Sequence, residues 1–268
     1  MKLEVSKGFF KFKKTDYILE DINFSLADSD ILSILGPNGV GKTTLIKCLT
    51  GLLPWTRGET FIDDKNIFAM REGELWSNIS YIPQKRNFPF SYTGFEMVLF
   101  GSRSSMNIFE RPSQKDISRA REVMKLIGIE ELSDKNANEM SGGELQMVLI
   151  ARSLVKEPKI IILDEPESGL DYKNQIIILD LIKKLSASGV IIVMNTHYPE
   201  HALKISNKCF LLNYDKSYKF GETREVLNRE NLKKSFSVDV EINTTIVGEK
   251  EYKSIIPISI VGKKDKPW

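Results

Sequence analysis

Apolar residues in the first third of the chain either alternate with polar residues or form short clusters, and both patterns predict β-strands. Asp, Ser and Asn residues interrupt the runs, as they commonly do where strands end. The strands are expected at residues 2–12, 22–26 and 31–35. The third strand runs into a glycine-rich turn, and residues 43–53 then carry apolar side chains at helical spacing.

The middle of the chain has a different pattern, because its apolar residues recur with a period near 3.6 and strand patterns are scarce. Helical spacing covers residues 96–99, 113–127 and 142–155. The pair Ser113 and Asp116 is typical of a helix start, since the serine hydroxyl can accept a hydrogen bond from a free backbone amide. These features predict a helical insertion over about residues 86–157.

Strand and helix patterns then alternate. Buried strands are expected at residues 159–163 and 190–194, and helices at residues 173–186 and 200–206. This alternation predicts an α/β fold with a mainly parallel sheet that helices cover on both faces. The pattern weakens after about residue 221, where it indicates one strand at 238–242 and assigns no element to residues 249–268.

Composition limits the classes of function. The chain has 268 residues, of which 41% are hydrophobic and 28% charged, so it can bury a core and remain soluble. This length suits one large α/β domain, or one domain with a sizeable insertion. The net charge of +2 is too small to indicate a nucleic-acid surface or an anionic membrane surface, so no nucleic-acid partner is expected.

Membrane spans, metal clusters and disulfides are also not expected. No apolar run approaches the roughly 18–20 residues that span a bilayer, and the first residues lack the apolar stretch of a signal peptide. We therefore expect the chain in the cytosol, with a peripheral role at any membrane. The two cysteines, Cys48 and Cys209, lie far apart in apolar surroundings, which predicts buried and inert thiols.

A glycine-rich loop lies between the strand at 31–35 and the helix at 43–53. It fits the phosphate-binding pattern G-x-x-x-x-G-K-[ST] and a second threonine follows it: Gly36, Pro37, Asn38, Gly39, Val40, Gly41, Lys42, Thr43 and Thr44. Glycines let backbone N–H groups approach phosphate oxygens, and the following helix points its positive end at the same anion. Lys42 can reach the β- and γ-phosphates, and the Thr43 hydroxyl can ligate Mg²⁺. ATP with Mg²⁺ is therefore the predicted ligand; the alternative is an ordinary glycine-rich turn.

Two acidic residues, Asp164 and Glu165, follow the apolar strand at 159–163. In open α/β sheets, ligands bind at the carboxyl ends of the strands. Asp164 is expected to hold Mg²⁺ through a water molecule, and Glu165 to polarise the attacking water as the general base. Successive side chains of a strand point to opposite faces, so both acids reach one site only if the strand ends there. Taken alone, the pair could also be a solvent-exposed strand end.

The run Met140-Ser141-Gly142-Gly143-Glu144-Leu145-Gln146 resembles the signature sequence of the ATP-binding cassette (ABC) family, and it precedes the carboxylate strand as in that family. Gln84, after a strand pattern at 79–82, is similar to the Q-loop glutamine. Ser168-Gly169-Leu170-Asp171 resembles the D-loop, and His197 resembles the switch histidine. Tyr17, 25 residues before Lys42, resembles the aromatic residue that stacks on adenine.

The resemblance implies a P-loop NTPase (ABC ATPase) fold, with an N-terminal antiparallel β subdomain and a helical subdomain inserted into the parallel core. It covers about residues 1–245 and leaves 246–268 as a C-terminal extension without assignment. It implies a head-to-tail dimer, in which the nucleotide of one copy is contacted by the second copy through Ser141, Gly142, Gly143 and Asp171. His197 would then donate a hydrogen bond to the γ-phosphate, and Gln84 would sense Mg²⁺ and the attacking water.

The sequence departs from the family pattern in three places. Met140 replaces the common leucine of the signature, Glu167 stands where threonine or serine is common, and Ser29-Asp30 stands where Gly-Glu is usual. None of these changes removes a catalytic group, so an active ATP hydrolase is expected. His201, four residues after His197, is expected to be a surface residue of a helix.

The kind of transporter is indicated by weaker similarities. The chain resembles importers of iron–siderophore complexes, haem and cobalamin in four stretches, at residues 88–101, 112–116, 146–152 and 237–240. This implies a subunit on the cytoplasmic face of the membrane, with separate integral membrane permease subunits and a substrate-binding protein. The alternatives are a zinc or manganese importer, another ABC transporter and a non-transport ABC ATPase. A nucleotide-binding module without turnover is a further alternative, against which the intact Glu165 and His197 argue.

Overall fold

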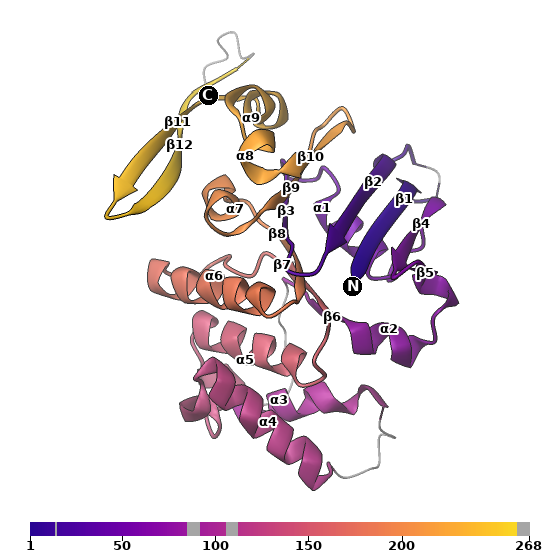
Figure 1. Ribbon diagram of the computed structural model, residues 1–268, viewed down its shortest axis with the longest axis vertical. Helices are drawn as coiled ribbons and strands as arrows, with labels where there is room; N and C mark the ends of the chain where they lie inside the picture. Colours follow the sequence, from indigo (N-terminus) through magenta and orange to yellow (C-terminus); the bar gives the residue numbers. More distant parts are fainter. Residues whose placement is uncertain (14, 85–91, 106–111, 262–268) are drawn as a thin grey trace.

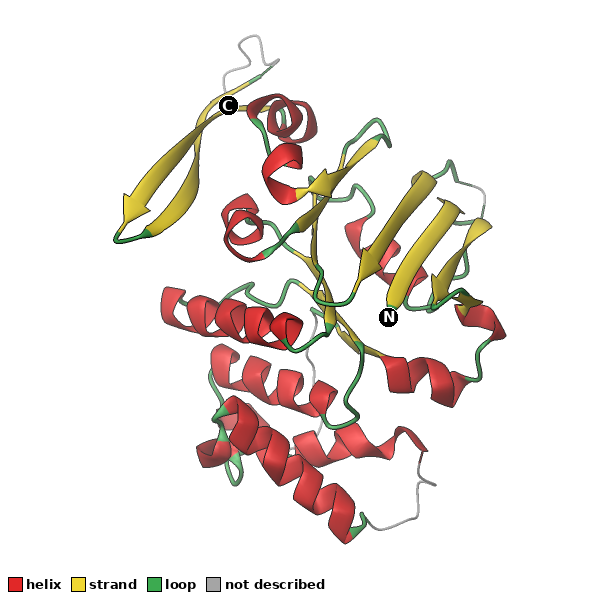
Figure 2. Ribbon diagram, in the orientation of Figure 1, coloured by secondary structure: helices red, strands yellow, loops and turns green. Residues whose placement is uncertain are grey.

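The computed structural model describes residues 1–13, 15–84, 92–105 and 112–261. Part of the importer-like stretch at 88–101, namely residues 88–91, lies outside the described residues, as do residues 262–268 of the expected C-terminal extension. In the described part, a mainly parallel sheet lies between a small antiparallel sheet and a group of helices (Figures 1 and 2).

A six-stranded sheet forms the centre of the protein, with the strand order β10-β9-β3-β8-β7-β6. Its neighbours pair in parallel, except that β10 at one edge is antiparallel to β9. The strands are β3 (Ile31–Leu35), β6 (Ile79–Ile82), β7 (Ile160–Asp164), β8 (Ile191–Asn195), β9 (Lys208–Leu212) and β10 (Tyr218–Glu222). Every residue of β3, β7 and β8 is buried, as expected for strands covered on both faces. The predicted mainly parallel sheet is therefore confirmed.

This sheet separates two hydrophobic cores, because the side chains of each strand alternate between its faces. Along β7, Ile160 and Ile162 belong to the core shared with the antiparallel sheet, whereas Ile161 and Leu163 belong to the core shared with the helical region. The helices that flank the sheet are α1 (Lys42–Leu49), α2 (Glu72–Asn78), α6 (Tyr172–Ala187) and α7 (Pro199–Ile205). The strand ends that carry the expected site residues are thus held from both sides.

The antiparallel sheet has the order β2-β1-β4-β5. Its strands are β1 (Lys2–Phe10), β2 (Leu19–Ala27), β4 (Arg57–Ile62) and β5 (Lys65–Asn66), followed by the short 3₁₀ helix η1 (Ile67–Ala69). The alternating burial of β2 matches its predicted pattern. The sequence pattern did not predict β4, because its residues Arg-Gly-Glu-Thr are mostly polar and the strand forms by pairing with β1.

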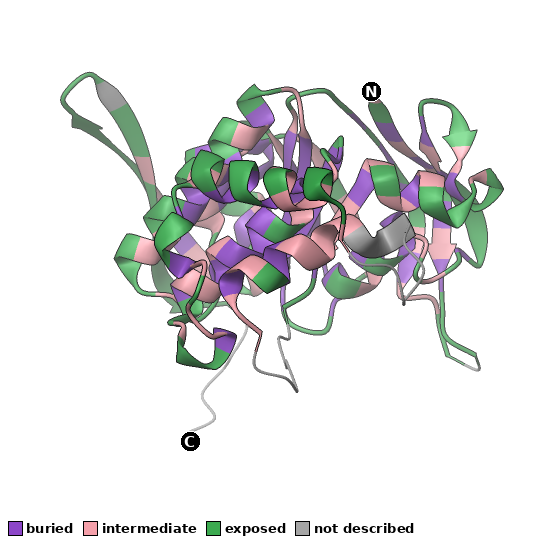
Figure 3. Ribbon diagram, turned by 90° about the horizontal axis from the view of Figure 1, so that it is seen from below, coloured by how far each residue is buried: buried purple, intermediate pink, exposed green. Residues whose placement is uncertain are grey.

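The helical region is as predicted for the middle of the chain. It contains α3 (Gly94–Leu99), η2 (Phe100–Ser105), α4 (Gln114–Ile127), η3 (Glu130–Leu132), η4 (Ala137–Glu139) and α5 (Gly142–Leu154). Ser113 caps α4 in a capping box with Asp116, which confirms the predicted helix start. Buried and exposed positions alternate along α3, α4 and α5, so each of these helices turns one side to the second core (Figure 3).

The C-terminal part ends in a two-stranded hairpin that extends away from the rest of the protein (Figure 1). The C-terminal part contains the helices α8 (Thr223–Val226) and α9 (Arg229–Phe236), and the hairpin consists of β11 (Val238–Val247) and β12 (Lys250–Ile260). The predicted strand at 238–242 is confirmed, but β11 continues past residue 245 and pairs with β12, to which the sequence pattern assigned no element. Pro257 and the adjacent Ile255 and Ile256 interrupt the alternation that predicts strands, and a two-stranded ribbon tolerates proline because each strand is an edge. Among the described residues, no helix has the length and apolar character needed to cross a bilayer.

Candidate functional site

The glycine-rich loop joins β3 to α1 at the carboxyl end of the central sheet. Gly36 has φ +145°, and a Cβ at this position would lie 2.7 Å from the carbonyl oxygen of Leu212. Gly41 has φ +110° and is the N-cap of α1, where a Cβ would lie 2.8 Å from the side chain of Ile18. Only glycine fits both positions, so the loop conformation is the one the sequence pattern predicts.

Lys42 begins α1 with its side chain buried in this loop. Its Nζ donates hydrogen bonds to the carbonyl oxygens of Gly36 at 2.7 Å and Pro37 at 3.0 Å. Burial lowers the pKa of Lys42, and the nearby carboxylates of Glu165 and Asp164 partly offset this effect. The ammonium group therefore lies over the loop and can exchange its carbonyl partners for phosphate oxygens.

A cleft of about 340 Å³ opens above the loop. Its walls come from three parts of the chain. The loop and α1 contribute Asn38, Gly39, Gly41, Lys42, Thr43 and Thr44, the strand ends contribute Glu165, Asn195 and His197, and the segment between β1 and β2 contributes Phe12 and Ile18. The structure thus brings the predicted phosphate loop, general base and switch histidine into one site.

Of the two neighbouring acids, Glu165 lines this cleft, whereas Asp164 is not among the described residues that line it and instead contacts the cleft residue Asn195. Asp164 is the last residue of β7, and its Oδ1 accepts a hydrogen bond from Nδ2 of Asn195 at 2.7 Å. Glu165 has a left-handed backbone, with φ +52°, which breaks the alternation of the strand. The end of the strand at Asp164, on which the sequence argument depended, is therefore present.

Glu165 lies between the two other predicted polar groups of the site. Its Oε1 is 2.6 Å from Nε2 of His197, and its Oε2 accepts a hydrogen bond from Nε2 of Gln84. The three residues follow three neighbouring strands, β7, β8 and β6, whose carboxyl ends meet at one edge. A carboxylate in this position can take a proton from a water molecule that attacks a phosphate held by the loop.

The oxygen donors of the cleft fit a magnesium ion. Thr43 lines the cleft, and Asp164 is buried; burial, together with the nearby Asp164 carboxylate, raises the pKa of the Tyr81 hydroxyl to about 12. The described residues contain no group of three or more His, Cys, Asp or Glu side chains that could hold a metal ion. Mg²⁺ needs no such group, since it binds nucleotides through one or two protein oxygens together with phosphate oxygens and water.

The signature residues lie outside this cleft. Ser141 is the N-cap of α5, and its backbone N–H donates to Oε2 of Glu144 at 2.7 Å in a capping box. Ser141 and Gly142 are exposed, and none of the described residues of the signature lines the cleft around Lys42. The N-terminus of α5, with its first backbone amides, is therefore not part of the described wall of the cleft in its own chain.

The D-loop lies directly beside the signature. A Cβ on Gly142 would lie 3.2 Å from the side chain of Leu170, and a Cβ on Gly143 would lie 2.4 Å from that of Asn174. Asp171 caps α6 by accepting a hydrogen bond from the backbone N–H of Asn174 at 2.8 Å. The two motifs are therefore in direct contact, and a side chain at position 143 would displace that of Asn174.

Tyr17, which was predicted to stack on adenine, lies outside the described wall of the cleft. Tyr17 is half-buried beside Phe9, at 5.7 Å between ring centroids, and Nζ of Lys11 lies 5.0 Å from its ring. Tyr17 is not among the described residues that line the cleft, whereas Phe12 is, with 48% of its surface exposed. Sequence reasoning missed Phe12, because its exposure and its place beside the phosphate loop are set by the tertiary structure.

Comparison with known proteins agrees with this site. The family described as ABC transporter matches residues 19–168. The chain is 33% identical over 257 residues to the molybdate import ATP-binding protein MolC of Haemophilus influenzae, with 96% of each chain covered. It is 36% identical over 243 residues to the "Probable iron chelatin transport ATP-binding protein" of Helicobacter pylori, covering 90% of this chain and 95% of that protein. An ABC transporter of proposed metal-chelate type, solved in an inward-facing conformation, contains a chain with a TM-score of 0.86 and 32% identity; 96% of this chain and 97% of that chain are covered.

The chain belongs to the ABC transporter family. The matched residues include the phosphate loop, the signature and both acids of the site. Within this family it is an ATP-binding subunit of the import type, an ATP hydrolase with the P-loop ATPase fold. The resemblance and the fold class expected from the sequence are confirmed.

Proposed function

We propose that two copies of this chain bind ATP between them, each nucleotide lying between the phosphate loop of one copy and the Ser141 helix end of the other. The observation that carries this proposal is the exposed N-terminus of α5, which lies outside the cleft of its own chain. Tyr172 and Ile176, at the adjacent start of α6, are 86% and 48% exposed, so apolar surface is also available there for a second copy. A two-fold pairing buries this surface twice and completes two sites at once.

In such a pair, the residues of the cleft have distinct tasks. Lys42 would exchange Gly36 and Pro37 for phosphate oxygens of ATP. Glu165 would take a proton from the water that attacks the γ-phosphorus, while ADP leaves. His197 would donate to the γ-phosphate, and Gln84 would contact the attacking water. When bound, Mg²⁺ would be held by Thr43 and Asp164 and would neutralise phosphate charge.

Subunit mixing tests the pairing. Lys42→Ala removes the phosphate contact of one site, and Ser141→Arg blocks the helix end that serves the other. Each variant alone should be inactive, but an equimolar mixture should regain about a quarter of wild-type turnover, because half of the dimers are mixed and each mixed dimer contains one intact site. A mixture as inactive as its components would contradict the proposal. Glu130→Gln, on the exposed η3 helix, provides a control that should not alter turnover in any pairing.

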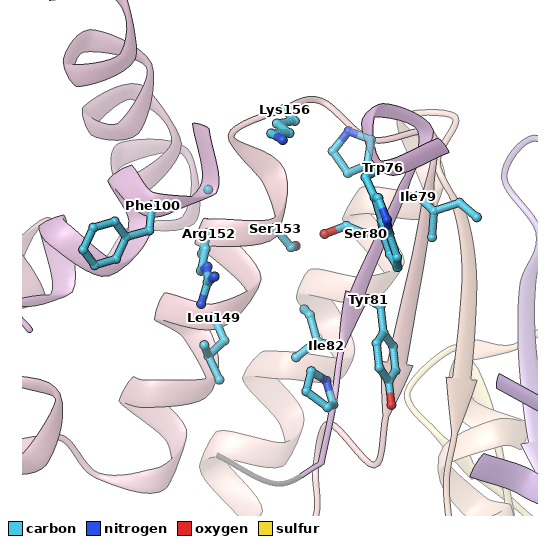
Figure 4. A pocket seen from close by; sticks show the side chains of 13 residues that line it. Trp76, Ile79, Ser80, Tyr81, Ile82, Phe100, Leu149, Arg152, Ser153 and Lys156 are labelled. Atoms are coloured by element: carbon cyan, nitrogen blue, oxygen red, sulfur yellow. The ribbon is translucent and has the colours of Figure 1, made fainter. Parts of the chain in front are cut away.

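We further propose that a permease subunit docks at a second cleft, of about 400 Å³, between α5 and the edge strand β6 (Figure 4). Arg152 of α5 and Lys156, two residues after the end of this helix, line this cleft together with apolar residues such as Trp76 and Leu149. No carboxylate occurs among the described residues that line it, and burial lowers the pKa of Lys156. An acidic and partly apolar segment of a membrane subunit fits this surface.

Charge reversal tests the docking surface. Arg152→Glu combined with Lys156→Glu should abolish co-purification with the permease, while ATP binding by the isolated subunit persists. A matched control is Lys219→Glu with Lys233→Glu, two exposed lysines of β10 and α9. Retention of the permease by the first pair, or its loss in the control pair, would contradict the assignment.

The transported substrate is proposed to be a metal chelate of the iron–siderophore, haem or cobalamin type, imported with a substrate-binding protein and energised from the cytoplasmic face. The iron chelatin relative and the transporter of proposed metal-chelate type support this proposal. Molybdate is the second candidate, because MolC is similar over 96% of the chain. Uptake of labelled iron chelates, molybdate and manganese by the reconstituted transporter distinguishes these candidates; exclusive uptake of molybdate or manganese would contradict the metal-chelate proposal.

A further inference from the structure

Glu167 follows the general base by two residues and is almost completely buried, with 1% of its surface exposed. Its Oε1 accepts a hydrogen bond from the Thr196 hydroxyl and lies 3.4 Å from Nδ1 of His201. Its Oε2 has no hydrogen-bond partner within the described part of the chain. A buried carboxylate is unfavourable without partners, so its position is determined by these two contacts.

Both partners of Glu167 belong to the segment that carries His197. While the Thr196 hydroxyl donates to Glu167, it accepts a hydrogen bond from the backbone N–H of Tyr198 at 3.0 Å. One hydroxyl group therefore connects Glu167 to the residues on both sides of His197. Thr196 is itself fully buried, which limits its freedom to form other contacts.

His201 adds a second connection to the same segment. It lies in α7, and its ring packs against that of Tyr198, with 4.7 Å between centroids. The expectation that His201 is a surface residue is wrong, because its side chain is only 16% exposed and faces Glu167. His201 does lie in a helix, as expected, but the turn of α7 directs this residue toward Glu167 in the loop after β7.

Two glutamate–histidine contacts thus join the loop after β7 to the segment after β8. Glu165 and His197 form one at the cleft, at 2.6 Å, and Glu167 and His201 form the other in the interior, at 3.4 Å. These are the two histidines of the chain. Threonine and serine, the common residues at position 167 in the family, have shorter side chains and carry no charge. The contacts of Glu167 with Thr196 and His201, called the Glu167 brace below, therefore depend on the glutamate of this chain.

We propose that Glu167 is a positioning residue for ATP hydrolysis: through Thr196 and His201 it holds His197 at the distance from Glu165 that turnover requires. This inference rests on the proposed roles of Glu165 and His197. Glu167 itself does not line the nucleotide cleft, so its loss should affect the chemical step far more than ATP binding.

The two histidines provide a direct readout, because their ring carbons give two assignable NMR signals in the full chain. Glu167→Ala should shift the His197 signal and lower kcat about 10- to 100-fold, as misplacement by roughly 1 Å does, with the KM for ATP changed less than about threefold. Ile182→Val, a buried change in α6, controls for general loss of packing and should do neither. An unchanged His197 signal, or a kcat within threefold of wild type, would overturn the proposal.

A second pair of variants decides the question if Glu167→Ala does not fold. Thr196→Val keeps the shape of the side chain but removes the hydroxyl, so it should reproduce the low kcat and the shifted His197 signal. Thr196→Ser retains the hydroxyl and should restore both; equal activity of the two variants would refute the Glu167 brace. His197→Ala tests the proposed role of His197 by itself. Wild-type turnover in this variant would show that this role is wrong, whatever the NMR signals of the other variants show.

Discussion

Replacing Glu165 with glutamine separates proton transfer from every other task of the cleft. Glutamine has the size and shape of the glutamate but cannot take a proton from water at neutral pH. A general base contributes roughly 10²–10⁴-fold to a rate. Glu165→Gln should therefore reduce turnover by this factor, which corresponds to about 3–5 kcal/mol in the activation barrier.

The geometry of Glu165 predicts that folding and binding survive this change. The amide oxygen of the new side chain can still accept from Nε2 of Gln84, and its NH₂ group can donate to the ring of His197. Both contacts persist, so the free energy of unfolding should change by less than about 1 kcal/mol. Lys42 and the loop are untouched, so ATP should bind as before and accumulate in a dimer that does not turn over.

Single-turnover hydrolysis of labelled ATP, with affinity measured separately by a fluorescent ATP analogue, distinguishes chemistry from binding. Light scattering on the same samples reports the dimer. Glu130→Gln, the same chemical change at an exposed position, is the matched control and should behave as wild type. Turnover within threefold of wild type would show that another group is the base. Weaker ATP binding by more than tenfold would show that Glu165 acts through the charge of the site.

Three further predictions concern binding, stability and thiol chemistry. Lys42→Ala should weaken ATP binding about 10- to 100-fold, because it removes a charge-assisted hydrogen bond worth roughly 1.5–3 kcal/mol; unchanged affinity in calorimetry would contradict the loop assignment. Ile162→Ala, at a completely buried position of β7, should lower the free energy of unfolding by about 2–5 kcal/mol in urea titrations, and a loss below 1 kcal/mol would contradict the packing described. Burial raises the pKa of Cys48 to about 12 and raises that of Cys209 as well, so at pH 8 roughly one Cys48 thiol in ten thousand is ionised. Labelling of native protein by a maleimide should be negligible and should appear on unfolding; fast labelling of the native state would refute the burial.

Residues that act through their own backbone or their near neighbours were predictable from the sequence. Gly36 and Gly41 need conformations that other residues disfavour, and the loop pattern around them identified the phosphate site. Ser113 and Asp116 form the cap of a helix within four residues of chain, so the sequence pattern alone was sufficient to predict this helix start. The buried strands β3, β7 and β8 were recognisable because a parallel sheet covered on both faces requires continuous apolar runs.

Features that depend on contacts between distant segments had no such local signal. Pairing with β1 determines β4, and pairing with β11 determines β12, although neither segment has a clear strand pattern of its own. Phe12 was missed as a wall of the nucleotide cleft, because its exposure depends on how the segment after β1 crosses the phosphate loop. His201 was misplaced on the surface for a related reason, since a buried glutamate from another strand end is its partner.

The sequence by itself determined the phosphate loop, the paired acids, the signature and the mainly parallel α/β fold, because each depends on residue types at short, fixed spacings. Only the tertiary structure decided that Glu165 contacts both Gln84 and His197, and that Glu167 lies against Thr196 and His201. The physical reason is the strand order: β6, β7 and β8 are adjacent in the sheet but far apart in the chain, and their carboxyl ends bring these side chains within hydrogen-bonding distance.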